Sequence, residues 1–462
     1  MSEYGRRIRI RVEVDLWRWP AGSLADTIDI TQDILNYRFQ KSIKNPSGSC
    51  QIAILPQRAE THILDVVNPM DVVRIYEFDT LKFVGQIVRV SYSGSIGQDG
   101  KPNRQATITC QQMGSLLTTA SLGIGLGTAL GVEADGLGSA AIKVSLAISE
   151  AVTDGTNFSE LARIVINAFR GYITDIGASN FNRYLDQYLD FSSGLVSTAQ
   201  PQLPRTFELF TGTEQSITLW QILDQLVERP YNELWIDNGP RNVSIDGKSV
   251  SLPAKACMVC RPTPFNGTVN RGTTQAFDLL PAVHIDQNHL LSFDLARSMD
   301  EVYTMYSVKE ATFQLGDLAR MLLGHALIDE DRIGKYLFKP MITELFYTRM
   351  ENADGDNQEA TLGTMQGVSL DSASTLLNWF KNNDQYLSGA LSHMVPENGD
   401  SDPKIGQKVT VYGIEGSFYV EGIAHMWNYQ GPLRCDLSVT RGYNGGERIK
   451  MRDRIFRRSV IR

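Results

Sequence analysis

An internal repeat constrains the fold of this 462-residue chain more than any other feature. Ile34–Ser42 resembles Leu290–Ser298 at an offset of 256 residues, and Val73–Tyr76 resembles Val409–Tyr412 at an offset of 336. Two glycines and a tyrosine in each copy recur at an offset of 337: Gly85, Tyr92 and Gly94, followed by Gly422, Tyr429 and Gly431. We interpret them as scaffold residues, because glycine permits a positive φ or a close approach of two backbones. The growing offset predicts an insertion within the second copy.

Both copies have the pattern of antiparallel β-strands. Apolar and charged residues alternate from Arg7 to Leu16, as in a strand with one buried and one solvated face. Further strands are expected at Ile34–Ile43, Cys50–Leu55, Val72–Tyr76, Lys82–Tyr92 and Gln105–Gln111. Helical spacing marks 157–169, 218–228, 315–327 and 372–380. The expected fold class is therefore mainly β with α insertions (α+β), containing two related antiparallel β barrels.

The chain divides into five predicted regions. These are a first β barrel (1–115), a Gly/Ala-rich and helical insert (116–205), an α+β connecting domain (206–280), a second β barrel with a helical insertion at about 313–387 (281–445), and a basic C-terminal tail (446–462). No membrane span is expected, because the most apolar stretch, Leu122–Ile148, is interrupted by Glu133, Asp135 and Lys143.

Charge and residue usage exclude several classes of function. The net charge of −8 provides no global basic field for nucleic acid phosphates, so a sequence-independent DNA binder is not expected. The five cysteines form no disulfide framework and fit a reducing cytosol. Cys257 and Cys260 form one CxxC within a strand-like run, where positions three apart point to opposite faces, so we expect them to be structural. The six histidines lack metal-ligand spacing, and we expect no metal and no cofactor.

The sequence contains no pair of a nucleophile and a base that can be assigned, so we expect no enzyme and no catalytic residue. Three acidic clusters are interpreted as solvated loops: Asp329–Asp331, Glu351–Glu359 and Glu397–Asp402. The spacing of the acids in Glu351–Glu359 does not match a calcium-binding loop. Two of these carboxylates could still serve glycoside hydrolysis, because such a pair needs only to be close in space.

The sequence resembles the central baseplate hub proteins of contractile phage tails and related injection machines, a family that includes the T-even hub and the late-control-protein-D-like proteins. The resemblance covers most of the chain and rests on the Ile34–Ser42 strand, on the hairpin from Asp71 to Tyr92, and on the late run from Ile405 to Gly442. It implies two tail-tube-like barrels per chain. Three chains would then form a pseudo-sixfold ring with true threefold symmetry, a homotrimer.

The same resemblance implies a function and its partners. The hub would join the sixfold tail tube, or tube-initiator proteins, to the trimeric central spike and form part of the ejection channel. Baseplate wedge proteins are further candidate partners, DNA passes transiently through the lumen, and no stable membrane association is implied. The expected location is the virion, in the tail baseplate, after assembly in the host cytoplasm. The insert from Leu116 to Pro204 and the arginine-rich tail depart from the family pattern.

The C-terminal tail holds the one strongly basic run of the sequence. Its candidate interface residues are Arg448, Arg452, Arg454, Phe456, Arg457 and Arg458. Because guanidinium groups pair well with carboxylates, we hypothesise that this tail docks on an acidic surface of a neighbouring subunit or of the spike. The alternative is a solvated, frayed tail.

Two other functions stay open at this point. One is the tail-tip protein of a non-contractile phage, which has a related pair of barrels. The other, from a different class, is a peptidoglycan-degrading tail enzyme, since carboxylates distant in sequence can meet in the fold.

Overall fold

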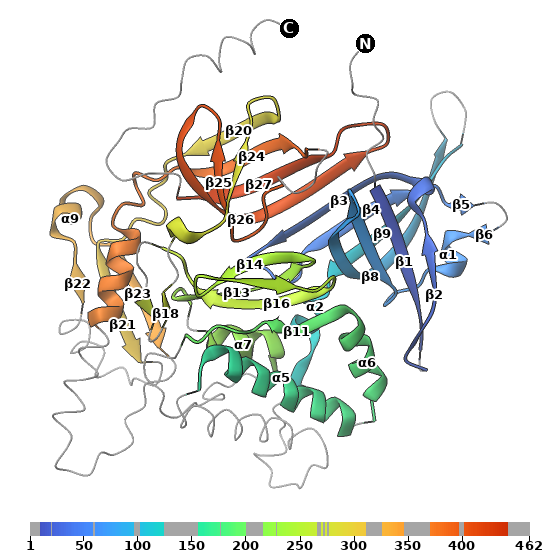
Figure 1. The fold of residues 1–462 in the computed structure, drawn as a ribbon, viewed down its shortest axis with the longest axis horizontal. Coiled ribbons are helices and arrows are strands. Elements are labelled where there is room, and N and C mark those ends of the chain that lie inside the picture. The colour runs from blue at the N-terminus through green and yellow to red at the C-terminus, as the bar shows by residue number, and fades with distance from the viewer. Residues whose placement is uncertain are drawn as a thin grey trace, which may run out of the picture.

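The computed structural model describes fourteen stretches of the chain: residues 10–19, 21–58, 61–96, 102–123, 156–175, 177–199, 216–227, 229–265, 269–270, 273–274, 277–310, 326–345, 370–396 and 402–441. Within them the protein is built mostly of antiparallel β-strands with a few helices (Figure 1). The expected mainly β fold class is confirmed.

Thirteen strands form one large sheet. They are β1 (Ile10–Arg18), β2 (Ser23–Asp29), β3 (Ile34–Ser42), β4 (Ser49–Ile54), β7 (Val72–Glu77), β8 (Thr80–Ile96), β9 (Pro102–Gln112), β19 (Ala282–Ile285), β20 (Leu290–Ala296), β24 (Ser388–Met394), β25 (Lys408–Val411), β26 (Ile414–Asn428) and β27 (Arg434–Thr440). The main path has the order β2-β1-β7-β8-β9-β4-β3-β26-β27-β24-β20, and β25 and β19 branch from β26.

The remaining elements are smaller. The other strands are β5 (Gln57–Arg58), β6 (Thr61–His62), β10 (Ser121–Gly123), β11 (Leu189–Gly194), β12 (Ser216–Thr218), β13 (Asn232–Asn238), β14 (Arg241–Ile245), β15 (Lys248–Leu252), β16 (Ala256–Pro262), β17 (Val269–Asn270), β18 (Thr273–Thr274), β21 (Met305–Glu310), β22 (Leu327–Ile328) and β23 (Pro340–Leu345). The helices are α1 (Ile63–Val66), α2 (Ser115–Thr119), α5 (Phe158–Asp175), α6 (Ser179–Tyr188), α7 (Leu219–Leu226), α9 (Glu330–Tyr336), one at 370–380, and the 3-10 turns η1 (Thr31–Asp33) and η2 (Phe277–Leu279).

The large sheet contains the same five-strand pattern twice. The order β7-β8-β9-β4-β3 of the first half recurs as β25-β26-β27-β24-β20 in the second, and every neighbouring pair is antiparallel in both. Outside this pattern the halves differ, because β1 pairs antiparallel with β7 whereas β19 pairs parallel with β25. The duplication inferred from the sequence is therefore present in the strand topology.

The irregularities of the two halves coincide as well. The β3–β4 pairing shifts at Leu35, and the β20–β24 pairing shifts 256 residues later at Leu291. The β8–β9 pairing shifts at Val88, and the β26–β27 pairing shifts at Glu421. A β-bulge adds one residue to one strand and locally increases the twist. The two halves therefore share the positions of these bulges as well as the order of their strands.

The pairings correct one alignment made from the sequence. Val88 and Glu421 are equivalent bulge residues, so β8 and β26 correspond at an offset of 333 residues rather than 337. Gly85 then corresponds to Phe418, because both pair with equivalent residues of β7 and β25, Val73 and Val409. The offsets of 256 and 336 are confirmed. The repeated Gly–Tyr–Gly spacing is therefore four residues out of register: the first copy lies within β8, whereas Tyr429 and Gly431 lie just beyond the end of β26.

The two halves do not stand apart as separate barrels in the described part of the chain. β3, the last strand of the first pattern, pairs antiparallel with β26 of the second, so one sheet continues through both (Figure 1). Buried side chains from both halves form a common hydrophobic core on one side of this sheet. The boundaries of the five predicted regions stay predictions.

A smaller sheet, β11-β16-β13, lies below the junction of the halves and separates two hydrophobic cores (Figure 1). Alternate residues of β16 face opposite sides: Cys257 packs in the core shared by the two halves, and Cys260 packs in the core of α5, α6 and α7. Burial raises the pKa of both thiols above the ordinary value, to about 12 for Cys260. The structural interpretation of the CxxC pattern fits this placement.

The helices follow the sequence patterns where the structure describes them. The Asn157 side chain accepts a hydrogen bond from the Glu160 backbone N–H at 2.9 Å and so caps the N-terminus of α5. Most of the helix expected at 315–327 lies outside the described residues, and Leu327 belongs to strand β22. In the ranges that the structure covers, every helix is too short or too polar to cross a bilayer.

Candidate functional site at the junction of the two halves

The junction is a ladder of seven residue pairs between β3 and β26, from Ser42 opposite Gly422 to Asn36 opposite Asn428. Two more backbone hydrogen bonds extend it, from Ile43 to Glu421 at 2.9 Å and from Tyr429 to Leu35 at 2.8 Å. Phe39 and His425 lie opposite each other here, with ring centroids 4.8 Å apart and nearly parallel planes. This ladder fixes the orientation of one half relative to the other.

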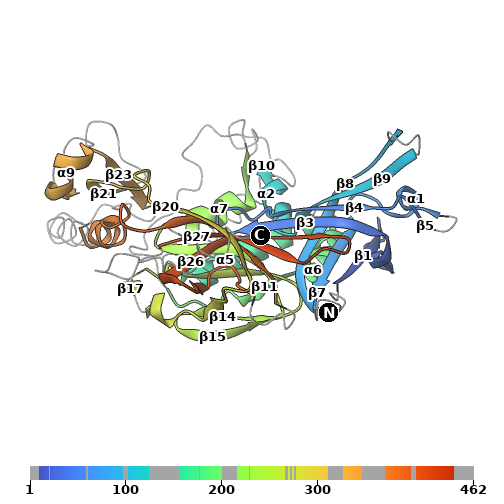
Figure 2. The ribbon, with the colours of Figure 1, turned by 90° about the horizontal axis from the view of Figure 1, so that it is seen from above.

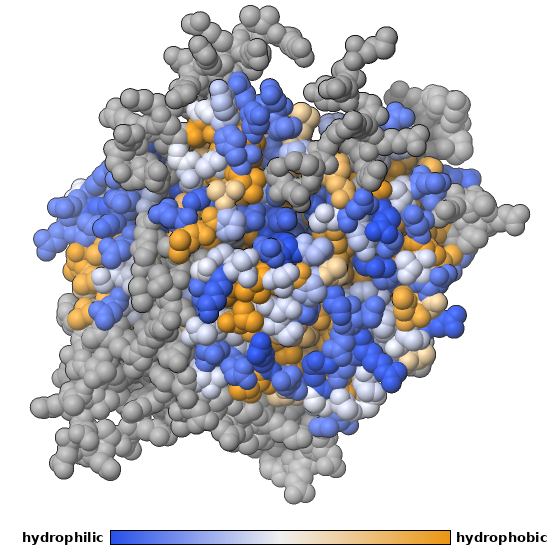
Figure 3. All heavy atoms as spheres, in the orientation of Figure 1, coloured by the Kyte–Doolittle hydropathy of each residue, from blue (hydrophilic) through white to orange (hydrophobic). Residues whose placement is uncertain are grey.

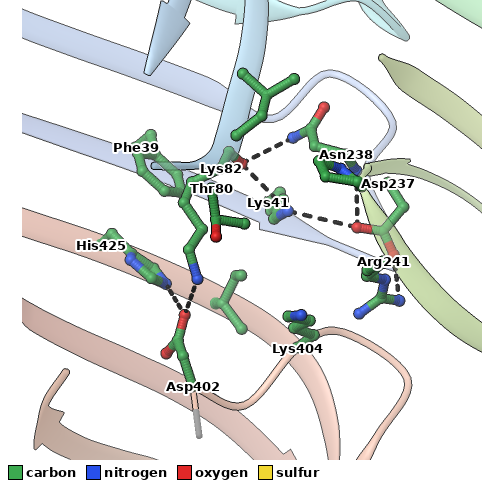
Figure 4. A pocket seen from close by; sticks show the side chains of 13 residues that line it. Phe39, Lys41, Thr80, Lys82, Asp237, Asn238, Arg241, Asp402, Lys404 and His425 are labelled. Carbon is green, nitrogen blue, oxygen red and sulfur yellow. Dashed lines mark hydrogen bonds and ion pairs between the residues drawn. The ribbon is translucent and has the colours of Figure 1, made fainter. Parts of the chain in front are cut away.

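A buried ion pair lies beside His425 of this ladder (Figure 4). The Lys82 ammonium on β8 donates to the Asp402 carboxylate at 2.7 Å, and the Nε2 atom of His425 lies 3.5 Å from the same carboxylate oxygen. Asp402 is only 1% exposed. Burial alone raises the pKa of Asp402, but the charges of Lys82 and His425 outweigh this effect and hold the pKa at about 2. The pair joins β8 of the first half to the loop before β25 of the second.

A second buried chain of hydrogen bonds crosses the junction beside it. Tyr37 donates its hydroxyl hydrogen to Glu77 at 2.7 Å, and the other oxygen of Glu77 lies 2.8 Å from Nδ1 of His425. The donor role of Nδ1 satisfies both groups, because a carboxylate can only accept. Burial raises the pKa of Tyr37 well above its ordinary value. A buried carboxylate with two partners is stable only while both stay in place.

The small sheet β11-β16-β13, here called the connecting sheet, also contacts the junction of the two halves. Asp237 at the end of β13 forms ion pairs with Lys41 and Arg241, and Asn238 donates to the backbone carbonyl of Lys82 at 3.0 Å. Arg241 also donates to the carbonyl of Ile405 at 2.9 Å. The cavity enclosed by these groups is about 20 Å³, room for about one water molecule. The geometry therefore suits a rigid joint rather than a substrate site.

A third set of contacts joins β13 and β16 to the second half. Arg261, fully buried, donates to Glu233 at 3.1 Å, to the Tyr419 hydroxyl at 2.9 Å and to the Gly406 carbonyl at 2.8 Å. Its guanidinium also lies 5.0 Å from the ring centroid of Trp235. A guanidinium has five N–H donors in a planar fork, against three on a lysine ammonium, and its flat face can also lie over an aromatic ring. Arg261 thus pins the connecting sheet to β26.

Two buried groups hold side chains of the metal-ligand type: His393 with Asp402 and Cys435, and Glu77 with Asp402 and His425. Within each group the ligand atoms lie within 4.8 Å of one another. The Lys82 ammonium already provides the cation that balances Asp402. Burial raises the pKa of the Cys435 thiol well above its ordinary value, whereas a metal binds the thiolate. These residues fit an internal ion-pair network better than a metal centre.

The residues singled out from the sequence are scattered relative to this junction. The six residues of the basic tail (Arg448, Arg452, Arg454, Phe456, Arg457 and Arg458) lie outside the described residues. Gly85 allows close approach, because a Cβ there would stand 2.5 Å from the backbone oxygen of Gln111. Gly422 lies in the ladder itself. Tyr92 is 44% exposed, and Tyr429 and Gly431 follow the end of β26.

The interpretation of Glu397–Asp402 as a solvated loop is wrong for Asp402, which is buried against Lys82. Sequence reasoning also missed Lys82, Lys41 and Arg261, because an isolated charge in a strand is normally solvated. One signal was present. Lys82 stands in the apolar run Leu81–Val84, whose residues all turn out to be buried.

Comparison with known proteins gives the fold. No family model matches the sequence, and no curated protein matches it significantly. A tail protein from Neisseria meningitidis MC58 aligns over 93% of this chain and 96% of its own, with 11% identity and a TM-score of 0.51. A 43 kDa tail protein of prophage MuSo2 from Shewanella oneidensis aligns over 94% and 98%, with 10% identity and a TM-score of 0.47. The first of these alignments shows that the chain has the fold of that tail protein, a fold that its resemblance to baseplate hubs implies.

Proposed function

We propose that this chain is the structural hub of a tail baseplate, in a phage or a phage-tail-like particle. As a homotrimer it would join the sixfold tail tube, or its initiator proteins, to the trimeric central spike and form part of the ejection channel. Its location would be the virion. The tail-protein fold supports a structural role in the tail, and the finer assignment rests on the arrangement within the chain.

The observation that carries the proposal is the repeated five-strand pattern with its coincident bulges. Two equivalent units per chain let three chains present six similar units around one axis. Closed point-group symmetry is the general preference of soluble oligomers. Such a ring offers sixfold contacts to a tube on one face and threefold contacts to a spike on the other.

The mechanism is geometric. The buried ion pairs between Lys82 and Asp402 and around Arg261 hold the two units in one fixed relation. Breaking a buried pair by removing one partner typically costs about 3–5 kcal/mol, so the joint resists bending when the sheath contracts. Force would then pass through the hub to the spike. The net charge of −8 per chain would let DNA pass the lumen without adhering.

The mass of the purified full-length protein in solution tests the proposal. Each chain has a mass of 51.5 kDa, and we expect a particle of three chains, alone or with a candidate spike protein. A stable dimer or tetramer would contradict the hub assignment.

The two alternatives predict other results. A tail-tip protein of a non-contractile phage would assemble on its tube without a sheath, so co-purification with sheath proteins from intact particles distinguishes it from a contractile hub. A peptidoglycan-degrading enzyme would release soluble fragments from purified cell walls, and a single carboxylate substitution would abolish that turnover. We expect no turnover.

A further inference from the structure

Strand β20 ends the large sheet with an apolar edge. Its partner on one side is β24, and within the described ranges no strand covers its other side. Leu291 is 47% exposed there, and Phe293 and Leu295 are half-buried. Apolar side chains are visible at the surface in the region of β20 and β24, with hydrophilic ones around them (Figure 3). An unprotected apolar edge strand is a template for pairing with another chain.

A second edge of the sheet lies on β8. Up to Gln86 this strand pairs with β7 on one side, and two backbone hydrogen bonds continue to Ile87, from Met70 at 2.8 Å and to Asp71 at 2.7 Å. Beyond Ile87 the ladder with β9 continues on the opposite side, but the described residues supply no strand on the β7 side. Val88 and Tyr92 are both 44% exposed in this stretch.

The junction inside the chain shows how two such edges fit. β3 is equivalent to β20 at an offset of 256 residues, and β26 is equivalent to β8 at an offset of 333. β26 loses its β25 partner at the equivalent point, after Val420, and from Gly422 onward it pairs with β3. The edge of β8 beyond Ile87 is therefore the counterpart of the edge of β26 that β3 occupies. The edge of β20 is the counterpart of β3.

We propose that β20 of one chain pairs antiparallel with the outer part of β8 of a second copy, in the register that the β3–β26 ladder defines. Transferring that ladder places Asp294 opposite Ser93, Leu295 opposite Tyr92 and Phe293 opposite Gly94. The inference rests on the proposed hub function for the number of copies, and it adds which edges meet and in which register.

The residues of β20 and β8 that this register places opposite each other are compatible on both faces of the sheet. Leu295 and Tyr92 replace the stacked pair Phe39 and His425 of the internal junction, on the face of the common core. Beside them Phe293 meets Gly94, so a large ring faces a residue without a side chain. On the other face Asp294 and Ala296 meet Ser93 and Ser91, small or polar groups suited to solvent. An apolar face and a polar face are what a half-buried ladder requires.

The two edges cannot meet within one chain. Along the sheet, β9, β4, β3, β26, β27 and β24 separate β8 from β20. The hairpin of β8 and β9 projects at one end of the molecule, away from β20 (Figure 2). Pairing must therefore be intermolecular and head-to-tail, a contact that closes into a ring when the rotation per unit divides the circle. The rotation that relates the first half of a chain to its second half would then be followed by an equivalent rotation to the next chain.

Cross-linking tests the seam in the full-length protein. The double variant Ser93→Cys/Asp294→Cys places two thiols directly opposite each other in the proposed pairing. In the β3–β26 ladder the pairs at Leu35 and Ile43 are hydrogen-bonded, and the two kinds of pair alternate, so the position equivalent to Asp294 belongs to a non-hydrogen-bonded pair. The Cα atoms of such a pair are about 4.5 Å apart, within the range of a disulfide. Mild oxidation should give linked dimers and trimers on a non-reducing denaturing gel. The five native cysteines are all buried and add little background.

Two matched variants control for geometry and register. Arg38→Cys with Met426→Cys is the equivalent pair inside the chain and should oxidise without any increase in mass. Arg89→Cys with Asp294→Cys tests a register displaced by four residues. This is the register that would follow if β8 and β26 corresponded at the offset of 337 residues taken from the sequence rather than at 333. It should remain unlinked. A trimer in solution that links through Arg89 and not through Ser93 overturns the seam while leaving the hub intact. Absence of any trimer overturns the seam and the hub together.

A backbone variant gives a second readout. In the template the residues equivalent to Leu295 and Phe293 direct their N–H groups across the ladder, so Leu295→Pro removes a hydrogen bond of the seam and none to β24. We expect it to shift the protein from trimer to monomer with cooperative unfolding retained. Leu295→Ala keeps the N–H and should stay largely trimeric. A Leu295→Pro protein as trimeric as the wild type would overturn the proposed pairing.

Discussion

Met70 and Gly406 occupy the same position in the two halves. Their φ angles are 76° and 75°, and each donates its backbone N–H to the strand behind it, to Ile87 at 2.8 Å and to Val420 at 2.9 Å. A positive φ costs a residue with a side chain of order 1–3 kcal/mol, whereas glycine adopts it freely. The turn before each hairpin is therefore a property of the repeated unit, which the first half keeps even with methionine.

Gly406→Ala should destabilise the protein. The new Cβ would stand 2.8 Å from the Arg261 guanidinium in addition to the unfavourable φ. We expect the free energy of unfolding in urea to fall by about 1–3 kcal/mol. Gly171→Ala is the control, since nothing lies within 4 Å of that position in α5, and it should raise the stability by about 0.5–1 kcal/mol. Equal urea midpoints for Gly406→Ala and the wild type would contradict the close contact.

Lys82→Met should be more damaging. It leaves the Asp402 carboxylate buried without its cation, and the loss of one partner of a buried pair costs about 3–5 kcal/mol. Lys44→Met is the matched control, because Lys44 pairs with Glu421 at 3.0 Å but its side chain is largely exposed. An exposed pair contributes at most about 1 kcal/mol. Similar unfolding curves for the two variants would show that Lys82 does not hold the junction.

The Asp402 carboxylate makes the free energy of unfolding depend on pH. The pKa of Asp402 in the folded protein is about 2, below the value of about 3.9 in an unfolded chain. Its ionised form therefore stabilises the fold, and this contribution is complete above about pH 5 and is lost as the pH falls toward 2. The stability difference between the wild type and Asp402→Asn should shrink by roughly 2–3 kcal/mol over that interval. A difference independent of pH would contradict the assignment of the pair.

Truncation after Glu447 tests the basic tail. It removes all six candidate interface residues, and we expect the trimer to persist while the complex with the spike protein is lost on co-purification. The physical reason is that guanidinium–carboxylate pairs and the intervening apolar residues contribute together at a partner surface. A full-length variant carrying Arg457→Lys and Arg458→Lys keeps the charge and should retain part of the binding. Unchanged binding by the truncated protein would leave the tail without this role.

Much of the fold could be predicted from the sequence, because periodicity reports which face of a strand is buried. The strands around Phe39 and Leu295 were aligned correctly, since their apolar alternation matches over nine residues. The strands around Gly85 and Gly422 were not. Their register depends on bulges at Val88 and Glu421 and on turns of different length, which residue types do not reveal.

The junction could not be predicted, and the reason is also physical. Lys82 and Asp402 resemble solvated charges in a sequence, because they are 320 residues apart. Arg261 does too, because its acceptors Glu233, Gly406 and Tyr419 lie 28, 145 and 158 residues away. Only the fold brings them together. The CxxC pattern was easier, since Cys257 and Cys260 needed only the alternation of one strand to be placed on opposite faces.

Electron microscopy of the isolated particle tests the central claim most directly. Averages viewed down the symmetry axis should show a closed ring with six similar lobes and true threefold symmetry, two lobes from each chain. A ring built from two or four chains, or lobes of the two halves that differ in fold, would contradict the account.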